Sequence, residues 1–417
     1  MTPNDRALQL LSEGKVLDAI PLLRDLAWRS PSYKAYINLA AALRHAGEFD
    51  DAIQYLARAV KLDAASPHAW MALANISTDV GDWEHALKYY EGAFFRVNQS
   101  PASVQDLRQV ALGLATALLR NHQFHEAWPL WEFGRYGYSY SELPGTARWL
   151  GEPTNSLLII CEGGYGDAML FGRWLPFAKS RAKHIKLVIW DRMTAFRDWS
   201  ALGVDEVIPK SAEIDATGIE YTTSWMSLPG IAGVRSVADI PRDSFYTYHW
   251  SKDADRVGFC WRAEENSIIR RTRSLSTADA EALALRLSSA GEVISLVPSP
   301  SAKSALYRAE DFVIPSGVTQ DEALLDGWDR TASTIRSCKF VVTVDTAVAH
   351  LAGLCGVPTL LLLPCASDWK FGTMVNQPRD PWYGEHVIYY RNPDPLKWHV
   401  EDIAVAASVL AGVCVSP

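Results

Sequence analysis

The chain has 417 residues, of which 48% are hydrophobic, 11% aromatic and 21% charged. At roughly 150 residues per domain, this length predicts two or three domains, and the apolar content excludes an intrinsically disordered chain. The 40 lysines and arginines and the 48 acidic residues leave a net charge of −8, which argues against non-specific binding to nucleic acid or to anionic membranes.

The sequence carries no visible signal for export or for membrane insertion. The N-terminal stretch MTPNDRALQL lacks a basic segment followed by an apolar one, and no apolar run approaches the roughly 18 residues that span a bilayer. The 6 cysteines are scattered and form no CxxC pair. Together these features predict a cytoplasmic protein with reduced thiols, without a zinc site or a disulfide framework.

Glycine and alanine recur at a fixed interval in the first third of the chain. Three glycines lie 33 and 34 residues apart, and three alanines keep the same spacing: Gly14, Gly47 and Gly81, then Ala19, Ala52 and Ala86. Each glycine is expected to end the first helix of a pair, each alanine to lie where two helices cross, and a proline to stop the second helix. This pattern, with Trp70-x-x-Leu73-Ala74, resembles the tetratricopeptide repeat (TPR).

Apolar residues at helical spacing predict helix pairs such as 35–45 and 49–62, and Pro67 closes that unit. A fourth, looser unit follows, because Ala127 lies 41 residues after Ala86 and not 34, which predicts an insertion of about seven residues near 100–107. We assign residues 1–130 to the repeats. A TPR stack normally holds a peptide or another protein segment, and capping of the neighbouring domain or dimerisation is the alternative.

Residues 131–155 are rich in aromatic side chains, whereas a flexible linker would be rich in glycine and serine. We therefore expect a packed connector, with an acceptor groove lined by some of these rings as the alternative.

From Ser156 onward, short apolar runs alternate with helical patterns, which predicts βαβ units and parallel sheets. The expected strands are 157–161, 185–190, 206–208 and 220–223, then 256–261, 293–297, 312–314, 340–344, 359–363 and 387–390. The predicted fold class is an all-α TPR superhelix followed by an α/β unit of two Rossmann-like halves, 156–245 and 246–395, with a C-terminal helix and tail over 396–417. A hinge is expected near 240–252. Two such halves bind ligands at the carboxyl ends of their strands, in the cleft between them.

The first candidate loop is Cys161-Glu-Gly-Gly-Tyr-Gly-Asp167, between the opening strand and a helical run over 168–178. Gly164 and Gly166 allow a sharp turn and a close approach of backbone to ligand, and Asp167 is placed at the helix start. The alternative is that Asp167 only caps the helix.

The second candidate loop follows the strand 340–344. Asp345 is expected in the turn, Thr346 caps the helix, and Ala347 belongs to its first turn. The free N–H groups and positive dipole end of such a helix suit a diphosphate without a metal, and His350 lies one turn further on. A partly buried helix residue is the alternative for His350, and a structural turn is the alternative for Asp345.

Four arginines gather after the strand 256–261, where guanidinium groups could neutralise phosphate charge. Arg262 and Arg273 flank this loop and are the better candidates, whereas Arg270 and Arg271 are expected in a solvated surface run.

The fourth candidate loop contains Asp368, Trp369 and Lys370, followed by Pro381-Trp382-Tyr383. An aromatic ring here could stack on a base or a sugar and Lys370 could reach a phosphate, while Trp382 is expected in the core.

Taken in order, the motifs 157–167, 273–275, 344–353 and 362–370, with Arg148-Trp149-Leu-Gly-Glu-Pro153 before them, resemble bacterial TPR-containing glycosyltransferases. Those enzymes are relatives of the ADP-heptose:lipopolysaccharide heptosyltransferases, glycosyltransferase family 9. The resemblance implies a GT-B fold, a nucleotide-diphosphate sugar donor, and transfer with inversion without an essential metal or cofactor. Two departures are that Phe371 stands where many relatives have Trp, and that the loop 262–273 lacks their Gly-Asn-Pro.

The resemblance implies that Asp167 is the general base and that Thr346, Ala347 and His350 bind the diphosphate. The full candidate donor-binding set is Gly164, Gly166, Arg262, Arg273, Asp345, Thr346, Ala347, His350, Asp368, Trp369 and Lys370, with no metal ligand.

The sequence thus predicts an inverting, metal-independent glycosyltransferase, of hexosyl or heptosyl type, whose repeats recruit a macromolecular acceptor, first of all a polypeptide. Within the enzyme class, the alternatives are a surface glycan, a lipid-linked sugar or a modified nucleotide as acceptor. The alternative from another class is a non-catalytic TPR adaptor with a degenerate transferase domain. The oligomeric state stays open.

Overall fold

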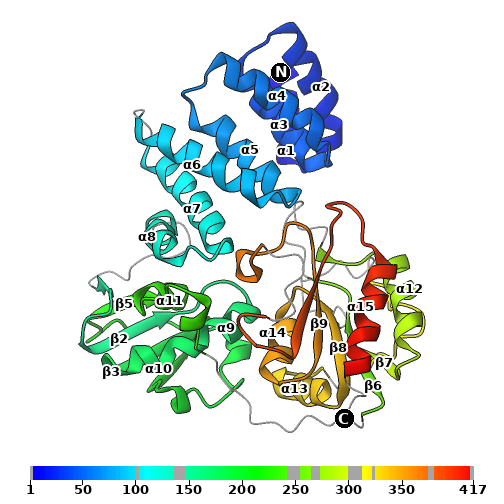
Figure 1. The fold of residues 1–417 in the computed structure, drawn as a ribbon. Coiled ribbons are helices and arrows are strands. Elements are labelled where there is room, and N and C mark those ends of the chain that lie inside the picture. The colour runs from blue at the N-terminus through cyan, green and yellow to red at the C-terminus, as the bar shows by residue number, and fades with distance from the viewer. Residues whose placement is uncertain are drawn as a thin grey trace. The chain divides into compact units, whose positions relative to one another are not determined.

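The computed structural model describes residues 3–99, 103–135, 146–241, 254–263, 273–298, 312–321, 325–373 and 380–413. The chain divides into two compact units (Figure 1). Unit 1 comprises Met1–Tyr136 together with the short segment Asp368–Thr373, and unit 2 comprises Gly137–Ser367 and Met374–Pro417.

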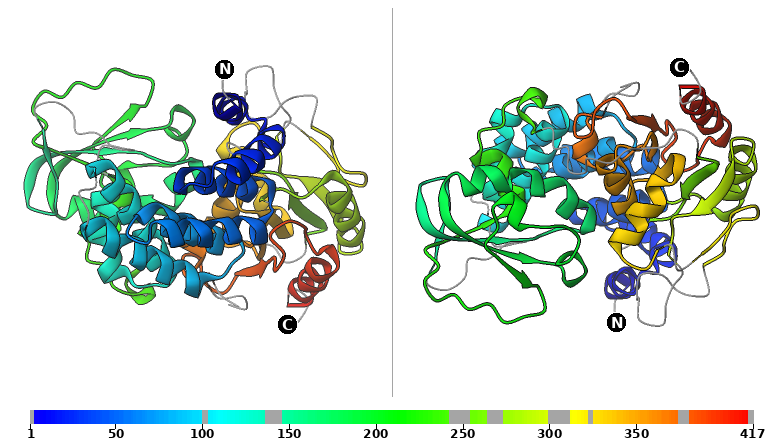
Figure 2. Two further views of the ribbon diagram at one scale, coloured as in Figure 1. Left: turned by 90° about the horizontal axis from the view of Figure 1, so that it is seen from above. Right: turned by 90° about the horizontal axis from the view of Figure 1, so that it is seen from below.

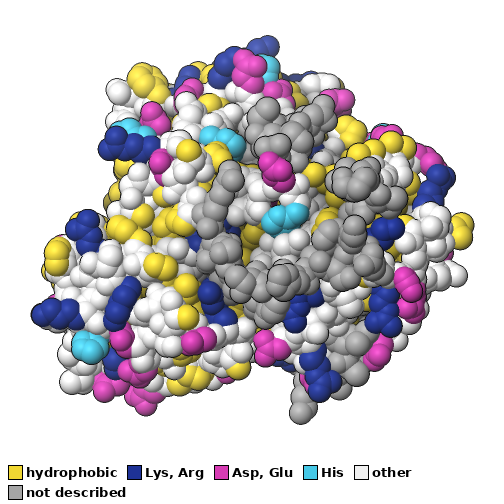
Figure 3. Space-filling model, turned by 60° about the horizontal axis from the view of Figure 1, so that its bottom comes forward, with side chains coloured by type: hydrophobic (Ala, Val, Ile, Leu, Met, Phe, Trp, Pro, Cys, Tyr) yellow, Lys and Arg dark blue, Asp and Glu magenta, His cyan; other side chains and the backbone are white. Residues whose placement is uncertain are grey.

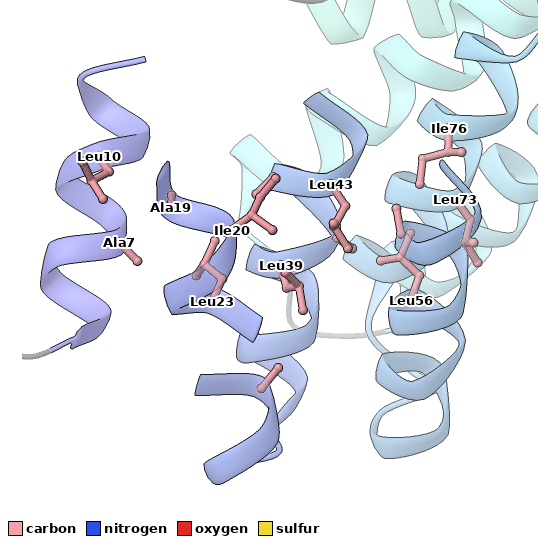
Figure 4. Packing of buried hydrophobic residues seen from close by; sticks show 14 residues of the cluster. Ala7, Leu10, Ala19, Ile20, Leu23, Leu39, Leu43, Leu56, Leu73 and Ile76 are labelled. Atoms are coloured by element: carbon pink, nitrogen blue, oxygen red, sulfur yellow. The ribbon is translucent and has the colours of Figure 1, made fainter. Parts of the chain in front are cut away.

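Unit 1 is helical, and each helix packs against the next one along the chain. Its helices are α1 (Pro3–Ser12), α2 (Val16–Arg29), α3 (Tyr33–Ala46), α4 (Phe49–Leu62), α5 (Pro67–Asp79), α6 (Trp83–Gln99), α7 (Val104–Arg120) and α8 (Phe124–Arg135). The predicted helix pair 35–45 and 49–62 is confirmed as α3 and α4. The apolar faces of α1 to α5 form one continuous core (Figure 4), which includes Leu23, Leu39 and Leu56.

The repeat spacing has the physical basis that the sequence predicts. Gly14, Gly47 and Gly81 all have a left-handed backbone, with φ between +74° and +80°, so a residue without Cβ is favoured at each helix end. The recurring alanines at 19, 52, 86 and 127 are all buried. In the fourth unit His122 stands 41 residues after Gly81 and takes the glycine's place, with φ +58°.

Two details of the repeats differ from the prediction. Pro67 does not stop a helix but begins one, since it is the first residue of α5 after its N-cap Ser66. The looser spacing of the fourth unit is accompanied by longer helices, because α6 and α7 each have 17 residues whereas α5 has 13. Residues 100–102 lie outside the described part.

The segment Asp368–Thr373 contributes a 3-10 helix, η9 (Trp369–Phe371), which packs against α7 in unit 1. The ring of Trp369 meets Trp128 and Trp131 edge to face, at centroid distances of 6.2 and 5.6 Å. Residues far along the sequence therefore complete the core of the last repeat.

The first sheet of unit 2 is parallel, with the strand order β1-β5-β2-β3-β4 (Figures 1 and 2). Its strands are β1 (Ala147–Arg148), β2 (Thr154–Ile160), β3 (Ala182–Ile189), β4 (Glu206–Pro209) and β5 (Tyr221–Ser224). The single helical run predicted over 168–178 is wrong: α9 (Tyr165–Phe171) and α10 (Leu175–Lys179) are separated by the 3-10 turn η1 (Gly172–Trp174), and Pro176 lies in the first turn of α10. A short helix, α11 (Leu228–Ile231), follows β5.

The second sheet is also parallel, with the order β10-β9-β8-β6-β7. Its strands are β6 (Arg256–Cys260), β7 (Glu292–Ser295), β8 (Cys338–Val344), β9 (Thr359–Leu363) and β10 (Val387–Arg391). The strand predicted over 312–314 is wrong, because a turn at Ser316 and Gly317 follows Pro315, and the described residues of this stretch make a single bridge, Ile294 with Thr319.

Helices cover both faces of the second sheet. They are α12 (Thr277–Leu287), α13 (Trp328–Arg336), α14 (Ala347–Leu354) and α15 (Val400–Val413). The steps β6 to β7 and β8 to β9 run in opposite directions across the sheet, so right-handed crossovers place α12 and α14 on opposite faces. All five residues of β9 are buried, as expected for a strand covered on both sides.

The predicted fold class, helical repeats followed by two parallel-sheet halves, is confirmed. The expected connector 131–155 is only partly described: residues 131–135 belong to α8, and Trp149, directly after β1, is fully buried with its ring 6.1 Å from that of Phe177. Most of the expected hinge 240–252 lies outside the described residues.

Candidate functional site

Each sheet of unit 2 contains a point at which the chain reverses its direction across the sheet. In the first sheet the chain passes from β2 to β3 and β4 on one side, and then returns to β5 on the other side of β2. Such a reversal is called a topological switch point. In open α/β sheets, ligands bind at the carboxyl ends of the strands at the switch point. The loop 161–167, which follows β2, lies there.

A buried glutamate holds this first switch point together. Glu162 accepts a hydrogen bond from the hydroxyl of Ser224, the last residue of β5, and its carbonyl accepts one from the indole N–H of Trp225 at 3.0 Å. The two strand ends on either side of the switch point are therefore joined. Glu162 belongs to the glycine-rich loop 161–167, but the sequence pattern alone predicts no role for it.

The second sheet reverses between β6 and β8, where Arg262 and Asp345 follow the strand ends. Arg273 donates to the backbone carbonyl of Asp345, and its Nε lies 3.7 Å from the Asp345 carboxylate. Arg273 thus fixes the loop after β8. Arg262 is half-buried directly after β6, while Arg270 and Arg271 lie outside the described residues.

The two switch points meet where α9 packs against α14. A Cβ added to Gly166 would lie only 2.5 Å from Cδ2 of His350 and 3.5 Å from Cα of Ala347. The first turns of the two helices are therefore in direct contact, and the absence of a side chain at position 166 allows it. The loops predicted to carry the base and the diphosphate site are brought together.

Asp167 is half-buried in the first turn of α9. Its carboxylate accepts a hydrogen bond from the backbone N–H of Gly164 at 2.8 Å, so the capping role that sequence analysis kept as the alternative is observed. Burial, together with the nearby charge of Asp167, raises the pKa of the Cys161 thiol to about 12. A carboxylate held by a backbone N–H is fixed in its orientation.

Thr346 begins α14 and its side chain accepts the backbone N–H of Val348 at 3.2 Å, as predicted for a cap. The hydroxyl of Thr346 is also 3.7 Å from Sγ of Cys260 at the end of β6. His350 is buried, and its Nδ1 lies 2.7 Å from the hydroxyl of Tyr383.

A buried polar cluster that sequence analysis missed stands beside His350. Arg173, in η1, donates to the backbone carbonyl of Trp382 at 2.8 Å. Asp380 accepts the backbone N–H of Tyr383 at 2.9 Å and the hydroxyl of Tyr389, and burial raises the pKa of Asp380 to about 6. The Pro-Trp-Tyr triplet at 381–383 was the sequence feature that could have pointed to this cluster. Trp382 is buried, as predicted.

The fourth candidate loop has a different place from the one expected. Asp368, Trp369 and Lys370 belong to unit 1 and not to the cluster around α9 and α14. Asp368 caps η9, and Trp369 is a buried core residue against Trp128 and Trp131. The indole of Trp369 thus packs against two large rings of the last repeat, and the interpretation that an aromatic ring in this loop stacks on a base or sugar stays a prediction.

Within the described residues, no three His, Cys, Asp or Glu side chains gather closely enough to hold a metal ion. The side chains of Cys161, Cys260, Cys338, Cys355 and Cys365 are buried and form no disulfide among the described residues. The search of the described helices finds none that is both long and apolar enough to cross a membrane. On the face drawn in Figure 3, basic and acidic side chains are interspersed, which is typical of a modest net charge.

Comparisons with known proteins give matches to different parts of the chain. Two tetratricopeptide repeat models match residues 10–76 and 69–94. Protein FlbA of Caulobacter vibrioides is 27% identical over an alignment of 176 residues, and the match covers 33% of this chain. The chain spans only 29% of the length of that relative.

Among solved structures, the E. coli ADP-heptose lipopolysaccharide heptosyltransferase II has a TM-score of 0.41 and 14% identity, covering 63% of this chain and 100% of that one. The E. coli heptosyltransferase WaaC with ADP has a TM-score of 0.38 and 13% identity, covering 61% and 99%. PcrH in complex with the chaperone binding region of PopD has a TM-score of 0.27 and 18% identity, covering 28% and 90%. With the helix geometry described above, the family models establish that residues 10–94 are tetratricopeptide repeats.

Proposed function

We propose that unit 2 is a glycosyltransferase that uses a nucleotide-diphosphate sugar and inverts the configuration of the transferred sugar. The observation that carries this proposal is the contact between the two switch points. A carboxylate at the start of α9 and the amide end of α14 lie on adjacent first turns, which touch at Gly166 and His350. Group transfer from a diphosphate needs both a base and an anion site, close together.

In the proposed reaction, an acceptor hydroxyl attacks the anomeric carbon from the face opposite the diphosphate. Its oxygen forms the new bond to carbon while the bond from that carbon to the diphosphate oxygen breaks, so the configuration inverts. Asp167 takes the hydroxyl proton, and the electron pair leaves with the diphosphate.

The leaving diphosphate would be stabilised by the start of α14. The backbone N–H groups of Thr346 and Ala347 and the positive end of the helix dipole favour an anion there. His350 and Arg262 would add donors from neighbouring positions. Because these groups supply the positive potential themselves, we propose transfer without an essential metal or other cofactor.

We propose that the repeats of unit 1 bring the acceptor, with a polypeptide as the first candidate. TPR stacks present a curved helical surface to peptides and protein segments. A surface glycan, a lipid-linked sugar or a modified nucleotide would be recognised by other chemistry, and a mass-spectrometric search for glycosylated products separates these acceptors.

The test combines ligand binding with donor turnover, both in EDTA. We expect ADP, GDP or UDP to raise the melting temperature of the full chain, since a ligand that binds the native state stabilises it. The matching nucleotide sugar should be hydrolysed slowly, and Asp167→Asn should lower that rate about 100-fold or more with nucleotide affinity kept. Asp198→Asn, at an exposed carboxylate that accepts hydrogen bonds from Ser200, is the matched control.

A non-catalytic adaptor is the second candidate, favoured by the capping bond that Asp167 makes to Gly164. Nucleotide binding without hydrolysis of the matching nucleotide sugar would support the adaptor, whereas hydrolysis that Asp167→Asn leaves unchanged would contradict the role of Asp167 as the base. A full chain that none of the three nucleotides stabilises would contradict both the donor and the anion site.

A further inference from the structure

Tyr383 lies outside the residues assigned to donor binding, yet it contacts His350 directly. Its hydroxyl is 2.7 Å from Nδ1 of His350, and the two rings meet edge to face at 5.9 Å. The ring is seated on Gly353, where an added Cβ would lie 2.5 Å from Cγ of Tyr383. The ring of Tyr383 therefore packs against the segment from His350 to Gly353, and the hydrogen bond between its hydroxyl and Nδ1 orients the imidazole of His350.

Arg173 determines which way the proton between Tyr383 and His350 points. Its guanidinium is buried and donates to the carbonyls of Leu170 and Trp382 at 2.9 and 2.8 Å. Its positive charge lies close to Tyr383, 5.3 Å from the centre of that ring. Because a positive charge attracts the lone pairs of the hydroxyl oxygen and repels its hydrogen, the hydroxyl proton points away from Arg173 and toward Nδ1 of His350.

The hydroxyl of Tyr383 keeps its proton, because burial raises its pKa. A neutral imidazole carries one proton, so an Nδ1 that accepts from Tyr383 leaves that proton on Nε2. Nε2 faces the first turn of α9, where an added Cβ on Gly166 would lie 3.2 Å from it. The imidazole N–H is thus aimed at the place where the two first turns meet.

We infer that Tyr383 is a positioning residue that holds His350 in the Nε2–H form, ready to donate to a diphosphate at the start of α14. The identity of the ligand rests on the proposed function, whereas the tautomer of His350 does not. Tyr383 itself touches no reacting atom and acts through His350, and Arg173 acts through Tyr383.

The first experiment measures the tautomer in the full chain. Histidine-selective 15N labelling at about pH 8, where an unperturbed imidazole is neutral, distinguishes Nε2–H from Nδ1–H. The His350 signal is identified by its loss in His350→Gln. We expect Nε2–H in the natural protein and a mixture with Nδ1–H in Tyr383→Phe, which keeps the ring on Gly353. A natural protein with Nδ1–H, or an unchanged tautomer in Tyr383→Phe, overturns the inference.

The second experiment measures binding of ADP, GDP and UDP by calorimetry. Tyr383→Phe should weaken the nucleotide that binds by about tenfold, the loss expected for one misdirected hydrogen bond to a charged group. Tyr390→Phe is the matched control, because its hydroxyl makes no hydrogen bond within the described residues. Equal affinities for Tyr383→Phe and the natural protein contradict the role in binding. If no nucleotide binds at all, the proposed function fails, and the tautomer measurement still decides the role of Tyr383.

Discussion

Unit 1 and unit 2 are assembled from contacts of different range along the chain. In unit 1 each helix packs against the next, whereas in unit 2 the neighbours are distant, such as Leu157 beside Tyr221 or Gly166 against His350. The exception in unit 1 is Asp368–Thr373, which comes from far along the sequence. The difference shows that periodicity encodes the repeats, while the candidate site depends on pairings that no short stretch of sequence contains.

The largest loss of stability is expected at Asp368–Thr373, the segment of unit 1 that comes from far along the sequence. Trp369→Ala removes a buried ring that meets Trp128 and Trp131, and should lower the free energy of unfolding by about 3–5 kcal/mol. Hydrogen exchange should rise in α7 and α8. Trp28→Ala, at a side chain that is 85% exposed, is the control and should change little. Equal stability of the two variants would make the segment Asp368–Thr373 dispensable.

The next effect concerns the contact between the two halves of unit 2. Gly166→Ala places a methyl group 2.5 Å from the His350 ring, and should cost about 1–3 kcal/mol of stability and abolish donor hydrolysis. The control is Gly172→Ala, whose new methyl group would find its nearest atom at 3.5 Å and whose φ is −55°. Thermal melting and a hydrolysis assay separate the two variants, and activity retained in Gly166→Ala would remove the close approach from the mechanism.

The smallest effect is a dependence of stability on pH that arises at Asp380. Burial raises its pKa to about 6, above the 3.8 of the unfolded chain, so the folded state holds a proton that the unfolded state has lost. Its contribution is therefore present at low pH and is lost as pH rises through 6, by roughly 2 kcal/mol between pH 4 and 7. Denaturant unfolding from pH 4 to 7 should show this slope, and Asp380→Asn should remove it. An unchanged slope in the variant would assign the dependence to other groups.

Much of the fold could be predicted because local patterns carry it. The spacing of glycine and alanine gave the register of the repeats, and apolar runs located nine of the strands to within a few residues. The errors occurred where local patterns mislead. Residues 312–314 are apolar but precede a turn, and β1 has only 2 residues, too few to show a pattern.

The candidate site was only partly predictable for the same reason. The loops around Asp167 and Thr346 carry recognisable glycine and capping patterns, and the structure brings them together. Arg173 and Tyr383 could not be paired from sequence, since they are separated by more than 200 residues. Trp369 followed a buried strand like a ligand-binding residue, and only the three-dimensional arrangement reveals the two rings that cover it.

The insertion of Asp368–Thr373 has a consequence for how this protein can be divided. A chain truncated after Tyr136 would lack the six residues that cover Trp128 and Trp131, and these indoles would be left facing water. Such a fragment should aggregate on expression. Recombination that moves the repeats to another protein would need to carry this short piece along, so the gene cannot be cut at one point to yield two independent modules.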